Sequence, residues 1–253
     1  MLVYIIVFKE DTERRQLLTA RFREIGLEPT FIDAIRGSEL PTEEQKKFQG
    51  MSRQIWAKEA FRSNAIGCAL SHFQAWNQFL NSGANGAFVF EDDAKPIESR
   101  KAQIKDQLGR LWANAAQFDI VFLANRQIQS KNTVFAGTAL DLCCLKYSGV
   151  GAESYFITRP AAERLLRNPL RLALEVDTLM HHWWLNGSKV LYLTQPLFEE
   201  DGRQTSIGYE GAEKARGGNL FLGLLRRVNR ARWSIYKRLK FPFYLRKMSR
   251  LVM

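Results

Sequence analysis

Apolar residues follow two alternating patterns along the chain: short unbroken runs and longer stretches with helical spacing. The short runs predict buried strands at residues 2–8, 29–33, 87–90, 119–123, 133–136, 141–147, 154–158 and 190–193. The helical spacing predicts helices at residues 12–24, 64–80, 98–115 and 176–185, with a further helix opening at Pro160. Strands that alternate with helices predict an α/β fold, a mainly parallel central sheet flanked by helices. In such sheets ligands bind beyond the carboxyl ends of the strands.

Charged residues divide the chain near residue 218. The 253 residues include 37 Lys and Arg and 26 Asp and Glu, a net charge of +11, and 46% are hydrophobic. Those fractions are typical of a globular protein and exclude the disordered and coiled-coil classes. Ten of the basic residues and no acidic one lie in residues 223–253, so the rest of the chain is nearly neutral. We therefore predict a single globular domain over residues 1–218 and a basic, amphipathic helical tail over residues 219–253.

The basic tail interleaves its arginines and lysines with bulky apolar side chains such as Trp233 and Phe243. This composition suits adsorption to an anionic membrane surface, where each basic residue contributes about 1 kcal/mol. A solvated positive tail is the alternative, and Pro242 is expected to interrupt any helix there. The chain has no run of about 18 uncharged apolar residues, so no membrane-spanning helix is predicted. Its three cysteines are odd in number and lack Cys-x-x-Cys spacing, which favours the reducing cytoplasm.

Three adjacent carboxylates, Glu91, Asp92 and Asp93, follow the predicted strand at residues 87–90. They repel one another unless a cation lies among them. Mg²⁺ and Mn²⁺ take oxygen ligands and commonly bridge a carboxylate to substrate phosphates. The arrangement suits nucleotide-sugar enzymes, in which the metal neutralises the leaving diphosphate. A solvated acidic turn that caps the next helix is the alternative.

The helix before this strand carries Ser71, His72 and Trp76. His72 and Trp76 are four residues apart and share a helix face, so His72 could donate to a phosphate or sugar while Trp76 stacks on a ring. Packing in the core is the alternative for both side chains. The adjacent His181 and His182 lack the spacing of a zinc-binding pair, and aromatic packing is expected there. The chain also lacks the nucleophile-elbow, dinucleotide-binding and Walker motifs, so hydrolase, redox and NTPase functions are not supported.

Taken together, residues 66–72 with Trp76 and residues 89–94 resemble the signature of glycosyltransferase family 25. That family contains bacterial lipooligosaccharide biosynthesis enzymes, often β-1,4-galactosyltransferases, and is similar to collagen galactosyltransferases. Further segments match in the family's order within residues 2–210, at residues 4–7, 13–15, 31–34, 154–158, 175–177 and 195–196. Two positions depart from the family pattern. Ala65 replaces a usual glutamate, and Val7-Phe8 replaces a usual Asn-Leu or Ser-Leu.

The resemblance implies a GT-A-like catalytic domain over residues 1–218, an inverting mechanism and a UDP-sugar donor, with UDP-galactose expected. It implies that Asp93, supported by Glu91 or Asp92, binds Mn²⁺ or Mg²⁺ against the donor diphosphate. Inversion needs a general base for the acceptor hydroxyl, and Asp177 is the candidate, with Glu153 in reserve. Capping of the helix N-terminus is the alternative role for Asp177. The residues expected to bind the donor are Arg14 and Asp92 near the phosphates, Asp33 at a uridine or ribose hydroxyl, and Ser71 and His72.

The resemblance also implies the partners. The acceptor would be a lipid-linked lipooligosaccharide or lipopolysaccharide core oligosaccharide. The protein would be cytoplasmic and peripheral on the inner face of the bacterial inner membrane, held there by residues 223–253. One alternative is a metal-dependent phosphodiesterase or nuclease whose basic tail binds nucleic acid. The nearly neutral body argues against it, so no nucleic-acid partner is expected. The other alternative is a non-catalytic membrane-binding module, which the departure at Ala65 leaves open.

Overall fold

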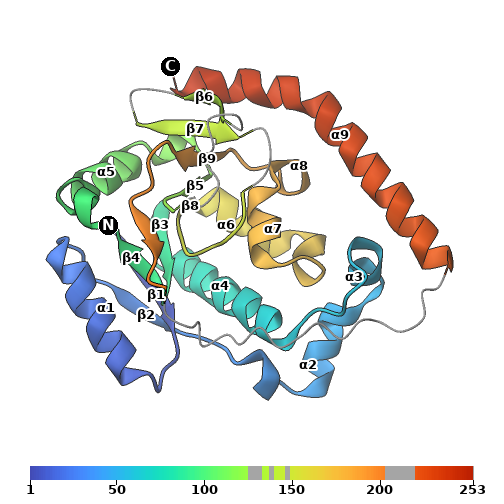
Figure 1. The fold of residues 1–253 in the computed structure, drawn as a ribbon, viewed down its shortest axis with the longest axis horizontal. Helices are drawn as coiled ribbons and strands as arrows, with labels where there is room; N and C mark the ends of the chain where they lie inside the picture. Colours follow the sequence, from blue (N-terminus) through green and yellow to red (C-terminus); the bar gives the residue numbers. More distant parts are fainter. Residues whose placement is uncertain (125–132, 137–139, 146–148, 203–219, 253) are drawn as a thin grey trace.

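The computed structural model describes residues 1–124, 133–136, 140–145, 149–202 and 220–252, and an eight-stranded sheet lies at its centre (Figure 1). The strand order is β2-β1-β3-β8-β5-β9-β7-β6. These strands are β1 (Val3–Val7), β2 (Thr30–Asp33), β3 (Gly86–Glu91), β5 (Ile120–Phe122), β6 (Thr133–Ala136), β7 (Leu142–Leu145), β8 (Ser154–Thr158) and β9 (Val190–Leu193). The pairings orient β7 and β8 against all the other strands of the sheet. The predicted α/β fold with a mainly parallel central sheet is therefore confirmed.

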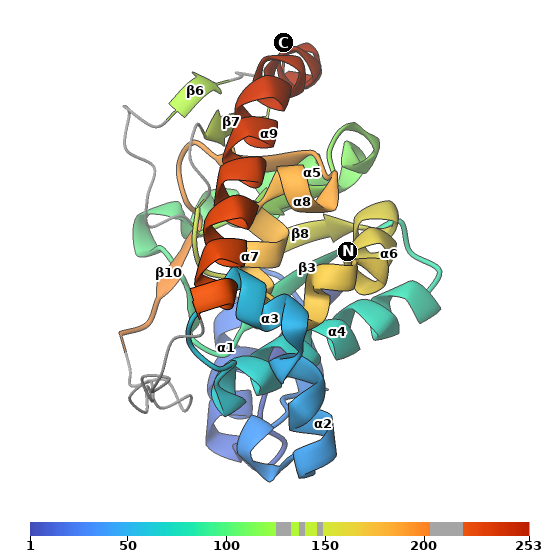
Figure 2. The same ribbon diagram turned by 90° about the vertical axis from the view of Figure 1, so that its right-hand side faces the viewer.

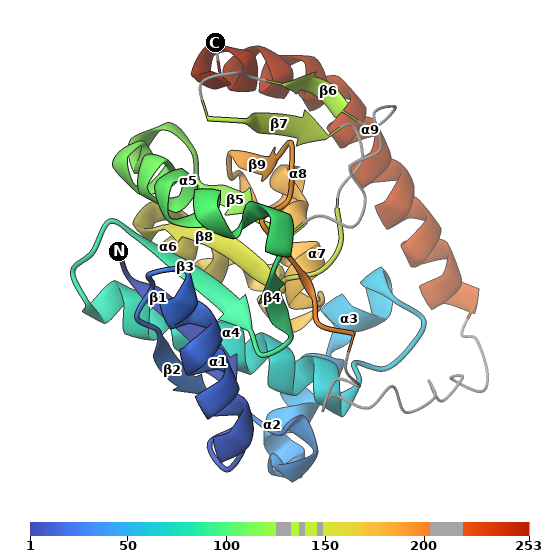
Figure 3. The ribbon, with the colours of Figure 1, turned by 60° about the vertical axis from the view of Figure 1, so that its left-hand side comes forward.

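Helices cover both faces of this sheet. They are α1 (Thr12–Glu24), α2 (Thr42–Lys46), α3 (Met51–Trp56), α4 (Ser63–Asn81), α5 (Lys101–Ala113), α6 (Arg159–Arg167), α7 (Val176–His181), α8 (Trp183–Asn186) and α9 (Leu220–Val252). Short 3-10 helices lie at Gly37–Glu39, Lys47–Gln49, Glu98–Arg100, Ala115–Gln117 and Pro169–Leu172. Figure 3 shows α1 and α5 in front of the sheet, with α4, α6 and α7 behind it. A separate antiparallel ribbon joins β4 (Ala94–Pro96) to β10 (Phe198–Glu200).

Successive residues of the central strands alternate between two hydrophobic clusters, one on each face of the sheet. In β8, Tyr155 and Ile157 join the cluster that contains Trp76 of α4, whereas Phe156 joins the cluster that contains Phe22 of α1. This alternation follows from the two-residue period of a strand. Because both faces are covered, the strand sequences are apolar without interruption, as the unbroken runs predicted.

The predicted strands and most of the predicted helices agree with the structure within a few residues. Residues 146–147 of the strand predicted at 141–147, and the domain boundary predicted near residue 218, lie outside the described residues. The single helix predicted over residues 176–185 is wrong, because α7 ends at His181 and α8 begins at Trp183. His182 lies between them with φ −86° and ψ 76°, outside the helical region. The chain therefore turns at this position, and His181 and His182 lie in different surroundings.

The expectation that Pro242 would interrupt the basic helix is also wrong, because α9 includes Pro242 within one continuous element. A proline inside a helix removes one hydrogen bond and crowds the preceding turn, so it bends the helix and costs about 3 kcal/mol. Figure 1 shows α9 bending part-way along its length. Contacts beside the proline offset that cost. The Tyr244 ring stacks on Trp183 with centroids 4.0 Å apart, and Met248 is fully buried.

The basic helix α9 is attached to the body of the molecule along its length, beside α3 and α8 (Figure 2). Near its start, Arg226 Nε donates to the carbonyl of Gln54 at 2.7 Å, and the Trp233 ring lies 5.9 Å from that of Trp56. Near its end, the Tyr244 hydroxyl accepts from the N–H of Val190 and donates to the carbonyl of the same residue, both at 2.9 Å. No helix among the described residues has the length and hydropathy to cross a membrane.

We expect Tyr244→Phe to lower the free energy of unfolding by about 1–3 kcal/mol, because it leaves the buried N–H and C=O of Val190 without the hydroxyl. Tyr236→Phe is the matched control on the same helix. Its ring is 41% exposed, so its effect should stay within about 0.5 kcal/mol. Urea unfolding followed by circular dichroism measures both values. Equal effects of the two substitutions would show that the hydroxyl of Tyr244 does not hold α9 to the sheet.

Candidate active site

Strand β3 delivers the acidic triplet to the carboxyl end of the parallel strands, where the sequence predicted it. Glu91 is the last residue of β3, and its N–H donates to the Glu153 carbonyl at 2.9 Å. Asp92 and Asp93 form the turn into β4, and the N–H of Asp201 donates to the Asp93 carbonyl at 2.9 Å. Asp93 is only 4% exposed, while Glu91 and Asp92 are partly exposed. The triplet therefore forms a hydrogen-bonded turn between β3 and β4.

Two arginines of α1 lie against these carboxylates. Arg14 Nη1 is 3.0 Å from Asp201 Oδ2 and its Nε is 3.6 Å from Asp92 Oδ2, while Arg21 Nη2 is 3.6 Å from Asp201 Oδ2. Burial raises the pKa of Asp92, and the positive charge of Arg14 partly opposes that rise. Arg14 was predicted to contact a donor phosphate, and in this structure its guanidinium is ion-paired. Asp201 was missed by the sequence analysis, and the acidic run at residues 199–201 was the one signal of it.

Two small residues of α4, Gly67 and Ser71, allow this helix to pack closely against the loop that follows β2. A Cβ on Gly67 would lie 2.3 Å from the Ile35 carbonyl oxygen, so only glycine permits this approach. One helical turn later, Ser71 Oγ accepts from the N–H of Ile35 at 2.8 Å and donates to the Gly67 carbonyl at 2.7 Å. Ser71 is buried and contacts the backbone here. Its predicted role in donor binding stays a prediction.

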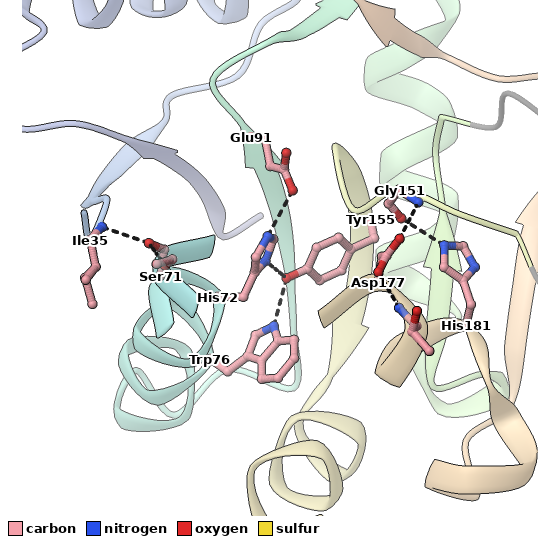
Figure 4. Close-up of polar contacts among 11 residues, drawn as sticks. Ile35, Ser71, His72, Trp76, Glu91, Gly151, Tyr155, Asp177 and His181 are labelled. Atoms are coloured by element: carbon pink, nitrogen blue, oxygen red, sulfur yellow. Dashed lines mark hydrogen bonds and ion pairs between the residues drawn. The ribbon is translucent and has the colours of Figure 1, made fainter. Parts of the chain in front are cut away.

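His72 and Trp76 converge on the Tyr155 hydroxyl, as Figure 4 shows. Trp76 Nε1 donates to this hydroxyl at 2.8 Å, His72 Nδ1 lies 2.8 Å from it, and His72 Nε2 lies 3.1 Å from Glu91 Oε1. A carboxylate only accepts, so we assign the His72 proton to Nε2. The Tyr155 hydroxyl then donates to Nδ1. Each donor in this series of hydrogen bonds has an acceptor, and the bond from His72 fixes the orientation of the Glu91 carboxylate.

A second network orients Asp177, on the other side of Tyr155 in Figure 4. The Gly151 N–H donates to Asp177 Oδ2 at 3.2 Å, and the Thr178 N–H donates to Oδ1 at 2.6 Å. His181, one turn along α7, donates from Nε2 to the Gly151 carbonyl at 2.8 Å. Gly151 has φ +89°, and a Cβ there would lie 2.2 Å from Glu153 Oε2. The positive φ favours glycine at this turn, and a larger residue would also have to displace the Glu153 carboxylate.

The His181 ring is enclosed by aromatic side chains. It stacks on Phe122 with centroids 3.7 Å apart, and its Nδ1 lies 2.8 Å from the Tyr192 hydroxyl. Burial lowers the pKa of His181 to about 4, although the Gly151 carbonyl and Asp177 favour the charged form. His181 is therefore neutral at pH 7, with its proton on Nε2. His182 stacks on Trp184 instead, and burial lowers its pKa to about 4 as well.

The half-buried thiol of Cys68 lies beside His72 and Glu91, and the charge of Asp177 also acts on it. Burial holds the pKa of Cys68 well above its ordinary value, and the negative charges of Glu91, Asp177 and Asp93 raise it further. The negative charges of the triplet and of Asp177 on α7 therefore both act on the Cys68 thiol. The ligand atoms of Cys68, His72 and Glu91 lie within 4.8 Å of one another. The region around Cys68, His72 and Glu91 is the candidate active site, and its carboxylates favour the binding of a cation.

Two predicted site residues lie apart from these contacts. Asp33 ends β2, two strands from β3, and its Oδ1 accepts from Arg15 Nη2 at 2.5 Å. The Asp33 side chain is 48% exposed. Glu153 precedes β8, and its carboxylate is buried beside Gly151. The structure thus brings Glu91, Asp93, His72 and Asp177 to one locality, with Glu153 beside it and Asp33 farther along the sheet.

The family model described as glycosyltransferase family 25 (LPS biosynthesis protein) matches residues 1–180. This chain belongs to glycosyltransferase family 25. A glycosyltransferase 25 family member of Drosophila melanogaster is 26% identical over 183 residues, which are 70% of this chain and 30% of that protein. A Bos taurus relative named probable inactive glycosyltransferase 25 family member 3 is 22% identical over 184 residues, 70% of this chain and 31% of that protein. The chain thus spans about a third of the length of these relatives.

Among solved structures, the family 25 chain is similar to a glycosyltransferase involved in the glycosylation of the major capsid of PBCV-1. The TM-score is 0.43 at 11% identity, with 82% of this chain and 95% of that chain covered. The protein A197 from STIV gives a TM-score of 0.38 at 13% identity, with 79% and 84% covered.

We expect Gly67→Ala to destabilise the family 25 chain by about 1–3 kcal/mol, because the new methyl group would overlap the Ile35 carbonyl. Gly109→Ala is the matched control within α5, where an added Cβ meets no atom within 4 Å. That control should stabilise the protein by up to about 1 kcal/mol, since alanine favours the helix. Thermal unfolding of both variants measures the contrast. Equal stabilisation by both substitutions would contradict the close contact at Gly67.

The lowered pKa of His181 predicts a loss of stability in mild acid. Between pH 6.5 and about 4 the unfolded chain binds a proton at His181 that the folded protein excludes, so the free energy of unfolding falls as the pH falls. The full effect is about 3 kcal/mol. His181→Gln can still donate to the Gly151 carbonyl but does not titrate, so its stability should fall less steeply over this range. Urea unfolding at several pH values tests this, and identical slopes would contradict a neutral, buried His181.

Proposed function

We propose that this chain transfers a hexose, galactose in the first instance, from a UDP-sugar to a lipooligosaccharide or lipopolysaccharide core oligosaccharide, with inversion. Membership of family 25 supports glycosyl transfer. The observation that carries the proposal is the position of the Glu91 carboxylate at the carboxyl end of β3, within 4.8 Å of the ligand atoms of His72 and Cys68, where the charges of Asp93 and Asp177 also act on Cys68. Carboxylates gathered at a strand end suit a substrate whose negative charge is balanced by a cation.

The donor set fits a divalent cation. Carboxylate oxygens are preferred by Mn²⁺ and Mg²⁺. The negative charge of Glu91, Asp93 and Asp177, which adds to burial in raising the pKa of Cys68, would be offset by such an ion. Glu91 and Asp93 would hold the ion, and His72 would keep Glu91 oriented through its Nε2. When bound, the ion would stabilise the charge that develops on the departing diphosphate.

Donor binding in this proposal uses Arg14, Asp92 and Asp33. The Arg14 guanidinium lies between Asp92 and Asp201, beside the triplet, where it contributes positive charge near the expected diphosphate. Asp33 is exposed enough to accept from a ribose or uridine hydroxyl while it remains paired with Arg15. Ser71 and His72 support donor binding indirectly. Ser71 holds the Ile35 backbone, and His72 holds Glu91.

Asp177 is the proposed general base for the acceptor hydroxyl. Its two oxygens each accept one backbone N–H, from Gly151 and Thr178, which fixes the orientation of the carboxylate. Each oxygen has a second lone pair, so a hydroxyl could still donate to it. The side chain is half-buried and remains reachable. Glu153 is the second candidate, and its burial beside Gly151 makes it less accessible.

The test is thermal unfolding with UDP, UDP-galactose, UDP-glucose or UDP-N-acetylglucosamine, each with and without Mn²⁺. A ligand at about 100 times its dissociation constant should stabilise the protein by about 2.7 kcal/mol. Asp93→Asn should abolish the part of the shift that needs Mn²⁺, whereas Asp106→Asn, at an exposed position of α5, should leave it unchanged. Asp177→Asn should retain the shift and lower the transfer rate by about 10²- to 10⁴-fold.

The outcomes separate the three functions considered. A metal-dependent shift together with sugar transfer supports the transferase. A shift without transfer or donor hydrolysis would favour a non-catalytic protein, a distinction made relevant by relatives whose names call them inactive. No shift with any nucleotide would overturn the donor site. Metal-dependent cleavage of DNA or RNA would favour the phosphodiesterase.

A further inference from the structure

The basic helix α9 has an inner face that is held against the body of the protein. Trp233, Phe241, Tyr244 and Met248 recur at intervals of three, four or eight residues, which places them on one side of the helix. Trp233 contacts Trp56, Phe241 and Tyr244 stack on Trp183, and Met248 is fully buried. These contacts fix the rotation of α9 about its own axis.

A second apolar stripe follows the opposite side of the same helix, which we call the outer stripe. Its side chains recur every four or seven residues and are all more than half exposed: Leu224 (58%), Val228 (57%), Ile235 (59%), Leu239 (66%) and Phe243 (67%). At 1.5 Å per residue the stripe is about 29 Å long. A soluble helix normally presents polar residues on the side away from the core, whereas α9 presents apolar residues on that side as well.

The charge on α9 indicates what covers the outer stripe. The segment from residue 223 onward contains ten basic residues and no acidic one. Arg232, Arg246 and Arg250 lie in line with the outer stripe, and Arg227 and Arg238 flank it and are exposed. A second copy of this chain would bring the same positive charge to the contact and be repelled. An anionic lipid surface offers opposite charge for the arginines and an apolar interior for the stripe.

We infer that the outer stripe of α9 inserts into the interface of an anionic membrane, with the helix lying in the membrane plane and the body held above it by the inner face. Because no helix of the described residues can span a bilayer, the contact is one of a helix on the surface. The inference concerns a surface outside the candidate active site, and it holds whether or not the proposed transfer reaction is correct.

The experiment is flotation of the full-length protein with vesicles of phosphatidylcholine alone or with 30% phosphatidylglycerol, without nucleotide or metal. We expect binding to the anionic vesicles only, weakened by salt. The triple variant Leu224→Gln/Ile235→Gln/Leu239→Gln keeps the charge and helix propensity, and should lower the partition coefficient at least about tenfold. Arg227→Gln/Arg238→Gln should lower it about fivefold for each arginine removed.

The matched control is Val150→Gln, which removes an exposed apolar side chain from elsewhere on the surface. It should bind as the unchanged protein does. Binding that depends on the arginines and not on the outer stripe would overturn the insertion. So would a lipid-free dimer, seen by light scattering, that the triple variant converts to a monomer, because a second copy would then cover the stripe. Failure of all variants to differ from the unchanged protein would also overturn the inference.

Discussion

The hydroxyl of Tyr155 is the contact on which the arrangement of the candidate active site depends. It accepts from Trp76 Nε1 and, with our assignment of the His72 tautomer, donates to His72 Nδ1, both at 2.8 Å. It thereby ties α4 to the central strand β8, and His72 in turn reaches Glu91 at the end of β3. Burial raises the pKa of Tyr155 well above its ordinary value, so the hydroxyl keeps its proton. A buried polar chain of this kind is favourable only when each member has its partner, which fixes the positions of all three elements.

The same construction recurs around Asp177. His181 stacks on Phe122 and contacts the Tyr192 hydroxyl, and its Nε2 holds the Gly151 turn that donates to Asp177. In both networks a buried, uncharged aromatic group and a histidine support a carboxylate that faces the candidate active site. Since the acidic groups stand on rigid supports, they cannot turn apart to relieve their mutual repulsion. Burial raises the pKa values of Asp92 and Cys68, and the negative charge of the neighbouring carboxylates raises them further.

The helix α9 combines two functions that a sequence pattern does not separate. Its inner face completes the core through Tyr244 and Met248, and its outer stripe remains exposed. Because apolar residues lie on opposite sides, they do not produce the single apolar face by which an amphipathic helix is usually recognised. Contacts of the inner face also explain why α9 continues through Pro242, since packing on either side of the proline stabilises a helix that local preference would end.

The sequence by itself determined the strand and helix order, the position of the acidic triplet after β3, and the family motifs on α4. These features depend on the local spacing of apolar and polar residues, which can be seen directly in the sequence. Tertiary structure alone decided that Tyr155 would meet His72, 83 residues away, and that Arg14 would pair with Asp201. It also decided which side of α9 faces the body. The reason is that a hydrogen bond or ion pair between distant segments depends on which strands become neighbours and in which register, and every buried polar group has several partners of suitable chemistry in the sequence.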